Sequence, residues 1–416
     1  MRLLRNLLSC AALALAAAPL GAQVLTLEAA RARALARQPA VAALELNARA
    51  MAEAAPAERA LPDPRLKLGL LNLPVRNFPR SPWEDMTQMV VSYEQMFPGG
   101  DKRRLRESRS FAEAAQAQAE ADAQRQMIQR DVAFAWLDGW WAQAAEGTVR
   151  ELVLEAGRAI EFAQIGVASG RGSQGEVFAA RQMRSQAADR RMELAAQAEK
   201  ARAMLRRWVP DAGSFELPAG LPVWREPPPL AALAEGLERH ALHAMHQRAL
   251  GVADADVALA REATSPDKTL EIGYGVRQGM NRSDMLMFQV AFELPMFREQ
   301  KQDRFLAAKL KFAERAREQR ADHLRQLRAE LDAAWAEWRI AGERLENFAQ
   351  AVLPAARGRL DTLLAAQASG RAELAQVLEA RRQLIEARLQ ELALKSGRAK
   401  ARAGIEYFEH STGEHK

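Results

Sequence analysis

The chain has very little cysteine, and it lacks the run of about 18 apolar residues that a membrane-spanning helix needs. Its single cysteine, Cys10, lies within residues 1–22, which have the charged start, apolar middle and small-residue end of a secretory signal peptide. We expect cleavage near Ala22, although Leu7 to Cys10 also loosely resembles a lipoprotein box. Cleavage would remove the only thiol and exclude disulfides and thiol catalysis from a mature, exported protein.

Motifs of catalytic sites are also missing. The sequence contains no nucleophile elbow, phosphate-binding loop or HExxH pair, so we expect neither enzymatic activity nor a cofactor. The formal net charge of +6 comes from segments of mixed sign, which we interpret as solvated helical faces. An exported chain does not meet nucleic acid, so the basic balance does not indicate a nucleic-acid partner.

The most informative feature that is present is a long internal repeat. Residues 168–171 and 368–371 both read Ala-Ser-Gly-Arg, 91–94 resemble 290–293, and 62–69 resemble 266–273 with a shared Pro-Asp pair. The repeats stand about 200 residues apart, far more than the period of a solenoid. We interpret this spacing as duplication of one whole structural unit.

Each repeat contains two stretches in which apolar and polar residues alternate. They are 65–70 and 88–97 in the first repeat and 269–276 and 288–294 in the second, within strand pairs 64–97 and 268–297. A period of two places alternate side chains on opposite faces of a strand. We therefore expect strands with one apolar and one polar face.

Long segments without proline predict unusually long helices. A helix from Asp101 to Ile165 would be on the order of 100 Å long at 1.5 Å per residue, and Glu299 to Leu353 is also free of proline. Turns around Gly170 and Gly370 return the chain, so we expect helical hairpins over 101–208 and 299–405. Single helices over Thr26–Arg59 and Leu230–Glu262 should precede the strand pairs.

The repeat also sets the domain boundaries. We expect a signal peptide at 1–22, the first repeat at 23–209, a Pro-rich link at 210–229, the second repeat at 230–405 and a polar tail at 406–416.

The apolar strand faces have no layer of the same chain to cover them. Their alternation is typical of outer-membrane barrels, which are apolar outside and polar inside. A barrel must close, and familiar small ones have about eight strands, so several chains must contribute. We therefore expect an α+β membrane protein whose strands join a barrel built by several chains, and three chains would give twelve strands. The alternative is a soluble four-stranded sheet capped by helices, but helices this long do not fold back over so small a sheet.

Several short motifs resemble the TolC family of outer-membrane factors. They are Leu27-Glu28-Ala29-Ala30, Leu35 to Pro39, the strand ends Phe97-Pro98-Gly99-Gly100 and Met296-Phe297, and the paired Ala-Ser-Gly-Arg turns. The resemblance implies a homotrimer in the outer membrane of a Gram-negative bacterium, with a helical tunnel in the periplasm. It also implies contact with outer-membrane lipid, a periplasmic adaptor and an inner-membrane transporter. The strand ends are closest in style to heavy-metal efflux subunits of the cobalt–zinc–cadmium or copper type.

The resemblance implies the exit duct of a tripartite efflux system, of resistance-nodulation-division type, for heavy-metal cations or small toxic compounds. One alternative is the channel of a type I protein secretion system. Another is a periplasmic coiled-coil adaptor or structural protein without a pore. Adaptors usually have one helical hairpin flanked by lipoyl-like β domains, whereas this chain has two hairpins.

In TolC-like tunnels, acidic residues line the periplasmic aperture. The two family positions fall on Gln376 and Glu379 in the second repeat, and Glu176 is the acidic counterpart in the first. A ring of such carboxylates would attract cations. The alternative is that they are solvated residues at helix starts, where a negative charge favours the helix dipole.

The two turns are the predicted tips of the tunnel. Gly170 and Gly370 should provide the tight turns. Arg171 and Arg371 either contact the adaptor or remain solvated.

Three histidines, His240, His243 and His246, recur every third residue near Met245 on a predicted helix. This spacing suggests a metal site. No cysteine or paired carboxylate completes the ligand set, so a structural role is the alternative.

Overall fold

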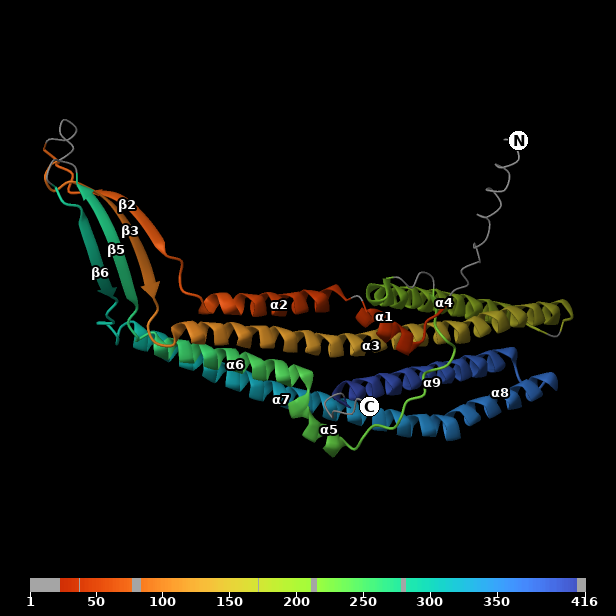
Figure 1. Ribbon diagram of the computed structural model, residues 1–416. Helices are drawn as coiled ribbons and strands as arrows, with labels where there is room; N and C mark the ends of the chain where they lie inside the picture. The colour runs from red at the N-terminus through yellow and green to blue at the C-terminus, as the bar shows by residue number, and fades with distance from the viewer. Residues whose placement is uncertain are drawn as a thin grey trace, which may run out of the picture. The chain divides into compact units, whose positions relative to one another are not determined.

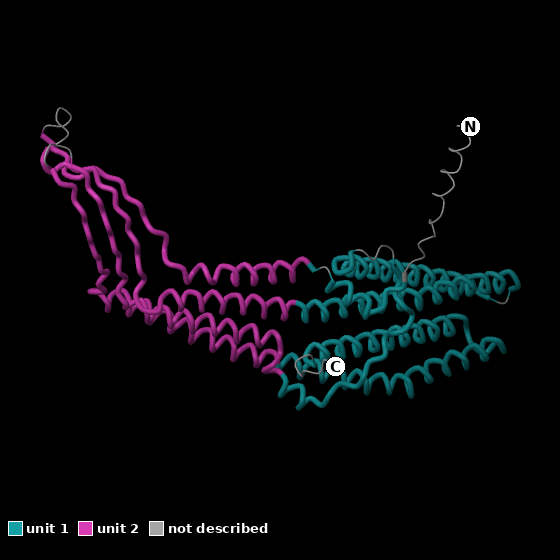
Figure 2. The backbone as a smooth tube through the Cα atoms, in the orientation of Figure 1, with its two compact units in different colours: residues 1–38, 125–236, 328–416 teal, residues 39–124, 237–327 magenta. Residues whose placement is uncertain are grey.

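The structure is a computed structural model, and its described residues fall into two compact units (Figure 2). The described residues are 23–36, 38–76, 84–170, 172–210, 215–277 and 282–409. Unit 1 is drawn from 1–38, 125–236 and 328–416, and unit 2 from 39–124 and 237–327. Both repeats contribute to each unit, so the units do not coincide with the repeats. The expected signal peptide, Cys10 and Arg171 lie outside the described residues.

Unit 2 contains an antiparallel sheet with the strand order β2-β3-β5-β6 (Figure 1). The strands are β2 (Arg65–Leu71), β3 (Gln88–Phe97), β5 (Lys268–Arg277) and β6 (Met285–Phe292). The register aligns Leu68 with Val91 and Val91 with Tyr274, so the apolar residues share one face as the alternation predicts. β6 begins earlier than expected because Met285 pairs with Gly275, and it ends before Leu294.

One carboxylate joins the helices of unit 2. Asp256 lies on α6 (Ala241–Glu262) and accepts 2.6 Å hydrogen bonds from Arg109 and from Lys309. These two residues belong to α3 (Lys102–Ala168) and α7 (Gln302–Asn347). The bridge therefore fixes α6 between two long helices that follow the strands.

The predicted single helices before the strand pairs are each broken. Thr26 caps the first as expected, but the chain forms α1 (Leu27–Ala36) and then α2 (Pro39–Arg59). Pro39 lacks an amide hydrogen and disfavours helical geometry in the residue before it. The second predicted helix divides into α5, η2 and α6, with bounds Leu230–Gly236, Leu237–Arg239 and Ala241–Glu262.

The predicted helical hairpins are present. In the first repeat α3 is followed by α4 (Gln174–Trp208). In the second, α7 continues through the π-helical turn η3 (Phe348–Val352) into α8 (Leu353–Ala368), and the chain returns as α9 (Leu374–Glu409). Pro354 at the start of α8 removes one backbone donor, which explains the irregular turn before it. The helix α9 extends into the expected polar tail because Tyr407 and Phe408 are buried.

The core of unit 1 is rich in alanine, which lets helices approach closely. Its buried residues from the hairpins are Ala145, Val149, Leu152, Ala156, Ala163, Val177, Ala180, Met183, Ala187, Leu194, Leu374, Leu378 and Ile385. Ion pairs Arg381–Glu155 and Arg388–Glu151 join α9 to α3 beside this core. None of the helices in the described part of the chain is both long and apolar enough to cross a membrane.

The Pro-rich link is fixed to the start of the chain. Within unit 1, the short strands β1 (Gln23–Val24) and β4 (Phe215–Glu216) pair in parallel. Further along the link, the ring centre of Trp224 lies 5.7 Å from the guanidinium carbon of Arg31 and 5.8 Å from that of Arg402. Neither contact is indicated by a pattern in the sequence.

Candidate channel elements

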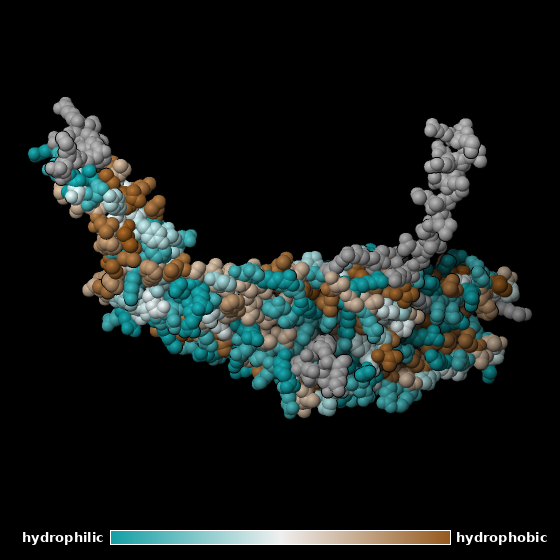
Figure 3. Space-filling model, viewed as in Figure 1, coloured by the Kyte–Doolittle hydropathy of each residue, from teal (hydrophilic) through white to brown (hydrophobic). Residues whose placement is uncertain are grey.

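One face of the sheet is apolar and open. Leu68 is 75% exposed, Phe288 67% and Val290 56%, although each lies in the middle of a strand. Further exposed apolar residues are Leu66, Leu70, Met89, Val91, Tyr93, Ile272, Tyr274, Val276, Leu286 and Phe292. Figure 3 shows hydrophobic residues gathered along the strands. A continuous apolar surface of this kind indicates contact with lipid or with another protein.

The opposite face of the sheet is joined by a polar network across three strands. The Lys67 ammonium donates to Glu94 and, at 2.9 Å, to Glu271, while the Ser92 hydroxyl donates to Glu271 at 2.5 Å. Gly273 lies within this face, where an added Cβ would stand 3.2 Å from the Cβ of Ser92. A sheet with one open apolar face and one hydrogen-bonded polar face has the pattern of a barrel wall around an aqueous lumen.

The two predicted tip turns have the same backbone geometry. Gly170 and Gly370 both have φ of +71°, a left-handed conformation that glycine adopts without strain. In the second turn, the amide of Arg371 donates to the Ala366 carbonyl at 2.8 Å, and its guanidinium donates to the Ser369 hydroxyl at 2.9 Å. The repeated motif therefore ends α3 and α8 in the same way.

Glu176 and Gln376 both stabilise helix starts. Glu176 forms a capping box with Ser173: the Ser173 amide donates to its carboxylate at 3.1 Å, and the Glu176 amide donates to the Ser173 hydroxyl at 3.3 Å. In α9, the Glu373 amide donates to the Gln376 side-chain oxygen at 3.3 Å. These contacts favour the structural alternative for this pair of positions.

Glu379 is held by a guanidinium group of its own helix. Arg382 donates to both of its carboxylate oxygens, at 2.6 and 2.9 Å, and Gln383 donates at 2.9 Å. The hydrogen bond from Arg382 is the main reason that the pKa of Glu379 lies below its usual 4.5. The carboxylate stays ionised at neutral pH, but the adjacent cation offsets much of its field.

The three histidines do not converge on a common point. His240 is buried and caps α6, where its Nδ1 accepts a hydrogen bond from the Leu242 amide at 3.3 Å. The ring of His246 stacks on His323 at 4.3 Å, and burial is the main cause that lowers the pKa of both His243 and His246. No group of three or more His, Cys, Asp or Glu in the described residues could hold a metal ion. The suggestion of a metal site here is not supported, because the side chains serve capping and packing.

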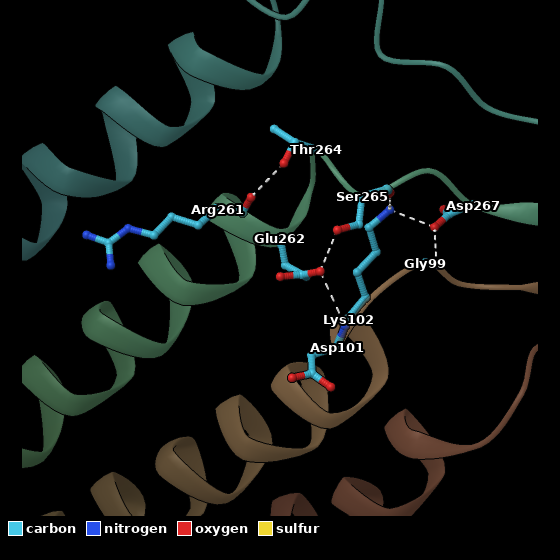
Figure 4. A network of polar contacts seen from close by, with 8 residues as sticks. All are labelled: Gly99, Asp101, Lys102, Arg261, Glu262, Thr264, Ser265 and Asp267. Atoms are coloured by element: carbon cyan, nitrogen blue, oxygen red, sulfur yellow. Dashed lines mark hydrogen bonds and ion pairs between the residues drawn. The ribbon is translucent and has the colours of Figure 1, made fainter.

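A polar junction that was not expected from the sequence lies where β3 leads into α3 and α6 leads into β5 (Figure 4). The Lys102 ammonium donates to the Asp267 carboxylate at 2.6 Å and to the Ser265 carbonyl at 2.7 Å. The amide of Gly99 donates to the same carboxylate at 2.7 Å. The Pro-Asp pair shared by the two repeats was the signal that pointed here.

Comparison with known proteins places this geometry in a known fold. No family model matches the chain, and no curated protein matches it by sequence. The outer membrane protein VceC from Vibrio cholerae has a TM-score of 0.77 at 21% identity over 92% of this chain and 95% of VceC. The open-state outer membrane channel MtrE of Neisseria gonorrhoeae has 0.77 at 17%, over 93% and 89%. The outer membrane channel CmeC of Campylobacter jejuni has 0.79 at 14%, over 92% and 85%.

The chain has the fold of these outer-membrane channels. Long helices combined with a four-stranded antiparallel sheet confirm the monomer fold that the TolC resemblance implied.

Proposed function

We propose that the chain is a TolC-type outer-membrane channel, the exit duct of a tripartite efflux system. Three chains form a homotrimer, whose sheets close into a twelve-stranded barrel in the outer membrane of a Gram-negative bacterium. The observation that carries the proposal is the open apolar face of the sheet, opposite a polar face joined by Lys67, Glu94 and Glu271. Contact with lipid on the outside of a barrel would cover such a face.

The helical hairpins form the periplasmic tunnel, and their turns at Gly170 and Gly370 dock onto a periplasmic adaptor. Arg171 and Arg371 belong to the same docking surface. The adaptor connects the channel to an inner-membrane transporter of resistance-nodulation-division type. The equal geometry of the two turns supports a role in which both meet one repetitive partner surface.

The exported substrates are small toxic compounds or heavy-metal cations, and the transporter selects among them. The group of His240, His243 and His246 gives no support to metal recognition by the channel itself. Export of proteins in a type I secretion system is the second candidate with a pore. A non-pore periplasmic adaptor is disfavoured, because its sheet would expose Leu68 and Phe288 to water.

In this proposal Glu379 lines the periplasmic aperture, and Glu176 and Gln376 lie at its rim, where their side chains cap the helices that begin there. Glu379 gives a weaker cation preference than an unpaired carboxylate would, because Arg382 binds it through both oxygens.

Native mass spectrometry in detergent and conductance in planar bilayers test the proposal together. We expect a trimer and stable single-channel conductance, with the protein retained in the outer membrane after carbonate washing. A carbonate-extractable monomer without conductance would contradict the channel and favour the periplasmic adaptor.

A further inference from the structure

The Pro-Asp pair is present in both repeats, but only the aspartate of the second repeat has a side-chain partner among the residues that the structure describes. Asp267, in the second repeat, accepts hydrogen bonds from the Lys102 ammonium at 2.6 Å and from the Gly99 amide at 2.7 Å (Figure 4). The side chains of Lys102 and Asp267 are 10% and 13% exposed. This buried ion pair closes the seam at which β3 of the first repeat pairs with β5 of the second.

Neighbouring groups fix the geometry of the seam. Glu262 accepts hydrogen bonds from the Ser265 hydroxyl at 2.5 Å and from the Asp101 amide at 3.3 Å. Gly100 has φ of +56°, and an added Cβ would stand 1.7 Å from a Glu262 oxygen. The last strand pair, Phe97 opposite Lys268, follows directly. The seam is therefore held by hydrogen bonds from both side chains and the backbone.

The corresponding aspartate of the first repeat is Asp63, which precedes β2. Asp63 and Gly69 are separated by the same number of residues as Asp267 and Gly273. β2 is an edge strand of the four-stranded sheet, and Asp63 is exposed. Its carboxylate makes no ion pair or side-chain hydrogen bond within the part of the chain that the structure describes.

The corresponding lysine follows the other edge of the sheet. Val290 and Val91 are matching residues of the two repeats. Lys301 follows Val290 by the same number of residues as Lys102 follows Val91. It lies beyond β6, which is the opposite edge strand. Its side chain is exposed, and within the described residues its ammonium has no ion-pair or hydrogen-bond partner.

The charges of the two edges are complementary. In the β3–β5 seam Glu94 lies opposite Glu271, and this like-charged pair is bridged by Lys67. By the repeat, Glu94 corresponds to Glu293 after β6, and Glu271 corresponds to Lys67 on β2. If β6 of one chain paired with β2 of another chain in this register, Glu293 would lie opposite Lys67. The opposite charges would favour this pairing.

We propose that Lys301 of one chain forms an ion pair with Asp63 of a second copy of the chain, the neighbouring subunit. This pair repeats the Lys102–Asp267 contact at each subunit boundary, where β6 pairs with β2 of the neighbouring subunit and Glu293 faces its Lys67. The inference deepens the proposed trimeric channel and rests on it. It assigns the residues that set the register between subunits.

Charge reversal tests the pair. We expect Asp63→Lys and Lys301→Asp each to lower the temperature at which the detergent-solubilised trimer dissociates, by about 4 °C or more. The double variant should restore it, because the ion pair reforms with its signs exchanged. Asp361→Lys and Arg357→Asp on α8 are matched controls, since both parent side chains are exposed and have no partner in the described residues. Single variants that dissociate like these controls, or a double variant without recovery, would overturn the proposal.

Crosslinking gives a second readout that does not depend on stability. In a chain with Asp63→Cys and Lys301→Cys, a short bismaleimide should produce covalent dimers and trimers on denaturing gels. The two single-cysteine variants should produce none. They also contain Cys10, so their lack of crosslinks would show that Cys10 does not form the product. If the parent protein is a conducting trimer but neither crosslink nor rescue is seen, the subunit pairing is wrong while the channel stands. If the parent is a monomer without conductance, the proposed function itself fails.

Discussion

The indole N–H of Trp136 donates a 2.8 Å hydrogen bond to the carbonyl oxygen of Leu25. Trp136 is completely buried and Leu25 is 1% exposed. On the next turn of α3, Trp140 donates at 3.1 Å to the carbonyl oxygen of Ala219 in the Pro-rich link. One face of α3 thus provides donors to the backbone carbonyls of two extended segments, which helps to fix both segments on the helix.

Substitution of Trp136 should separate packing from hydrogen bonding. We expect Trp136→Ala to destabilise unit 1 by about 3 to 5 kcal/mol, because it leaves a large cavity. Trp136→Phe should cost less, about 1 to 3 kcal/mol, because it keeps most of the ring but leaves the Leu25 carbonyl without a donor. Urea unfolding followed by far-ultraviolet circular dichroism measures both. A Phe variant as stable as the parent would show that the hydrogen bond contributes nothing.

The two turn glycines should respond alike to alanine. Gly170→Ala and Gly370→Ala should each cost about 1 to 2 kcal/mol, because a Cβ is strained at positive φ. Apart from the glycine and its chain neighbours, no described residue has an atom within 4 Å of the added Cβ at either position, so the cost is conformational. Gly358→Ala within α8 also meets open space and is the matched control, which should stabilise by about 1 kcal/mol. Equal effects at all three positions in thermal unfolding would contradict the turn assignment.

Arginine on the two faces of β6 should have different effects on assembly. Val290→Arg places a cation on the apolar face, where lipid contact would cost about 2 to 4 kcal/mol. Ala291→Arg places it on the polar face and should be tolerated better. On β5 the same contrast holds between Ile272→Arg and Gly273→Arg, although Met287 and Ser92 crowd an added Cβ at Gly273. The yield of trimer extracted from outer membranes measures the difference, and equal losses on both faces would refute the assigned register.

Ion selectivity should depend on the pairing of Glu379. Glu176→Gln combined with Glu379→Gln should lower cation selectivity and weaken block by multivalent cations, with little change in trimer stability. Arg382→Gln should raise cation selectivity, because it leaves the Glu379 carboxylate without its guanidinium partner. Reversal potentials in planar bilayers under a salt gradient measure both shifts. If neither variant differs from the parent, the constriction lies elsewhere.

The Lys102–Asp267 pair should make stability depend on acid pH. Burial alone would raise the pKa of Asp267, but hydrogen bonds from Lys102 and the Gly99 amide outweigh it and hold the pKa below its usual 3.8. A carboxyl with a depressed pKa contributes stability above its unfolded pKa and loses it as the pH falls through the folded value. We therefore expect the melting temperature to fall between about pH 5 and pH 2. Lys102→Met should lower stability at neutral pH and flatten this fall, and an unchanged pH profile would argue against the pair.

Much of the fold could be read from local patterns. The bounds of β3 are as predicted, because alternate side chains of any strand point to opposite faces whatever the strand pairs with. The turn at Gly370 was also predictable, since only glycine adopts positive φ without strain. Pro39 could have indicated the helix break before it, but the helical periodicity on both sides led to the expectation of a single helix.

The sequence by itself determined the duplication, the long helices and the two-faced strands, because each depends on residues close together in the chain. Tertiary structure decided which side chains meet. The strands β1 and β4 are too short to show a period, and they form only because distant backbones pair. His240 became a helix cap because the chain breaks before it. By contrast, the pairing of Arg382 with Glu379 is local, since the two residues stand three apart on one helix. Asp267 and Lys102 lie far apart in sequence, and only the pairing of β3 with β5 brings a carboxylate and an ammonium within hydrogen-bonding distance.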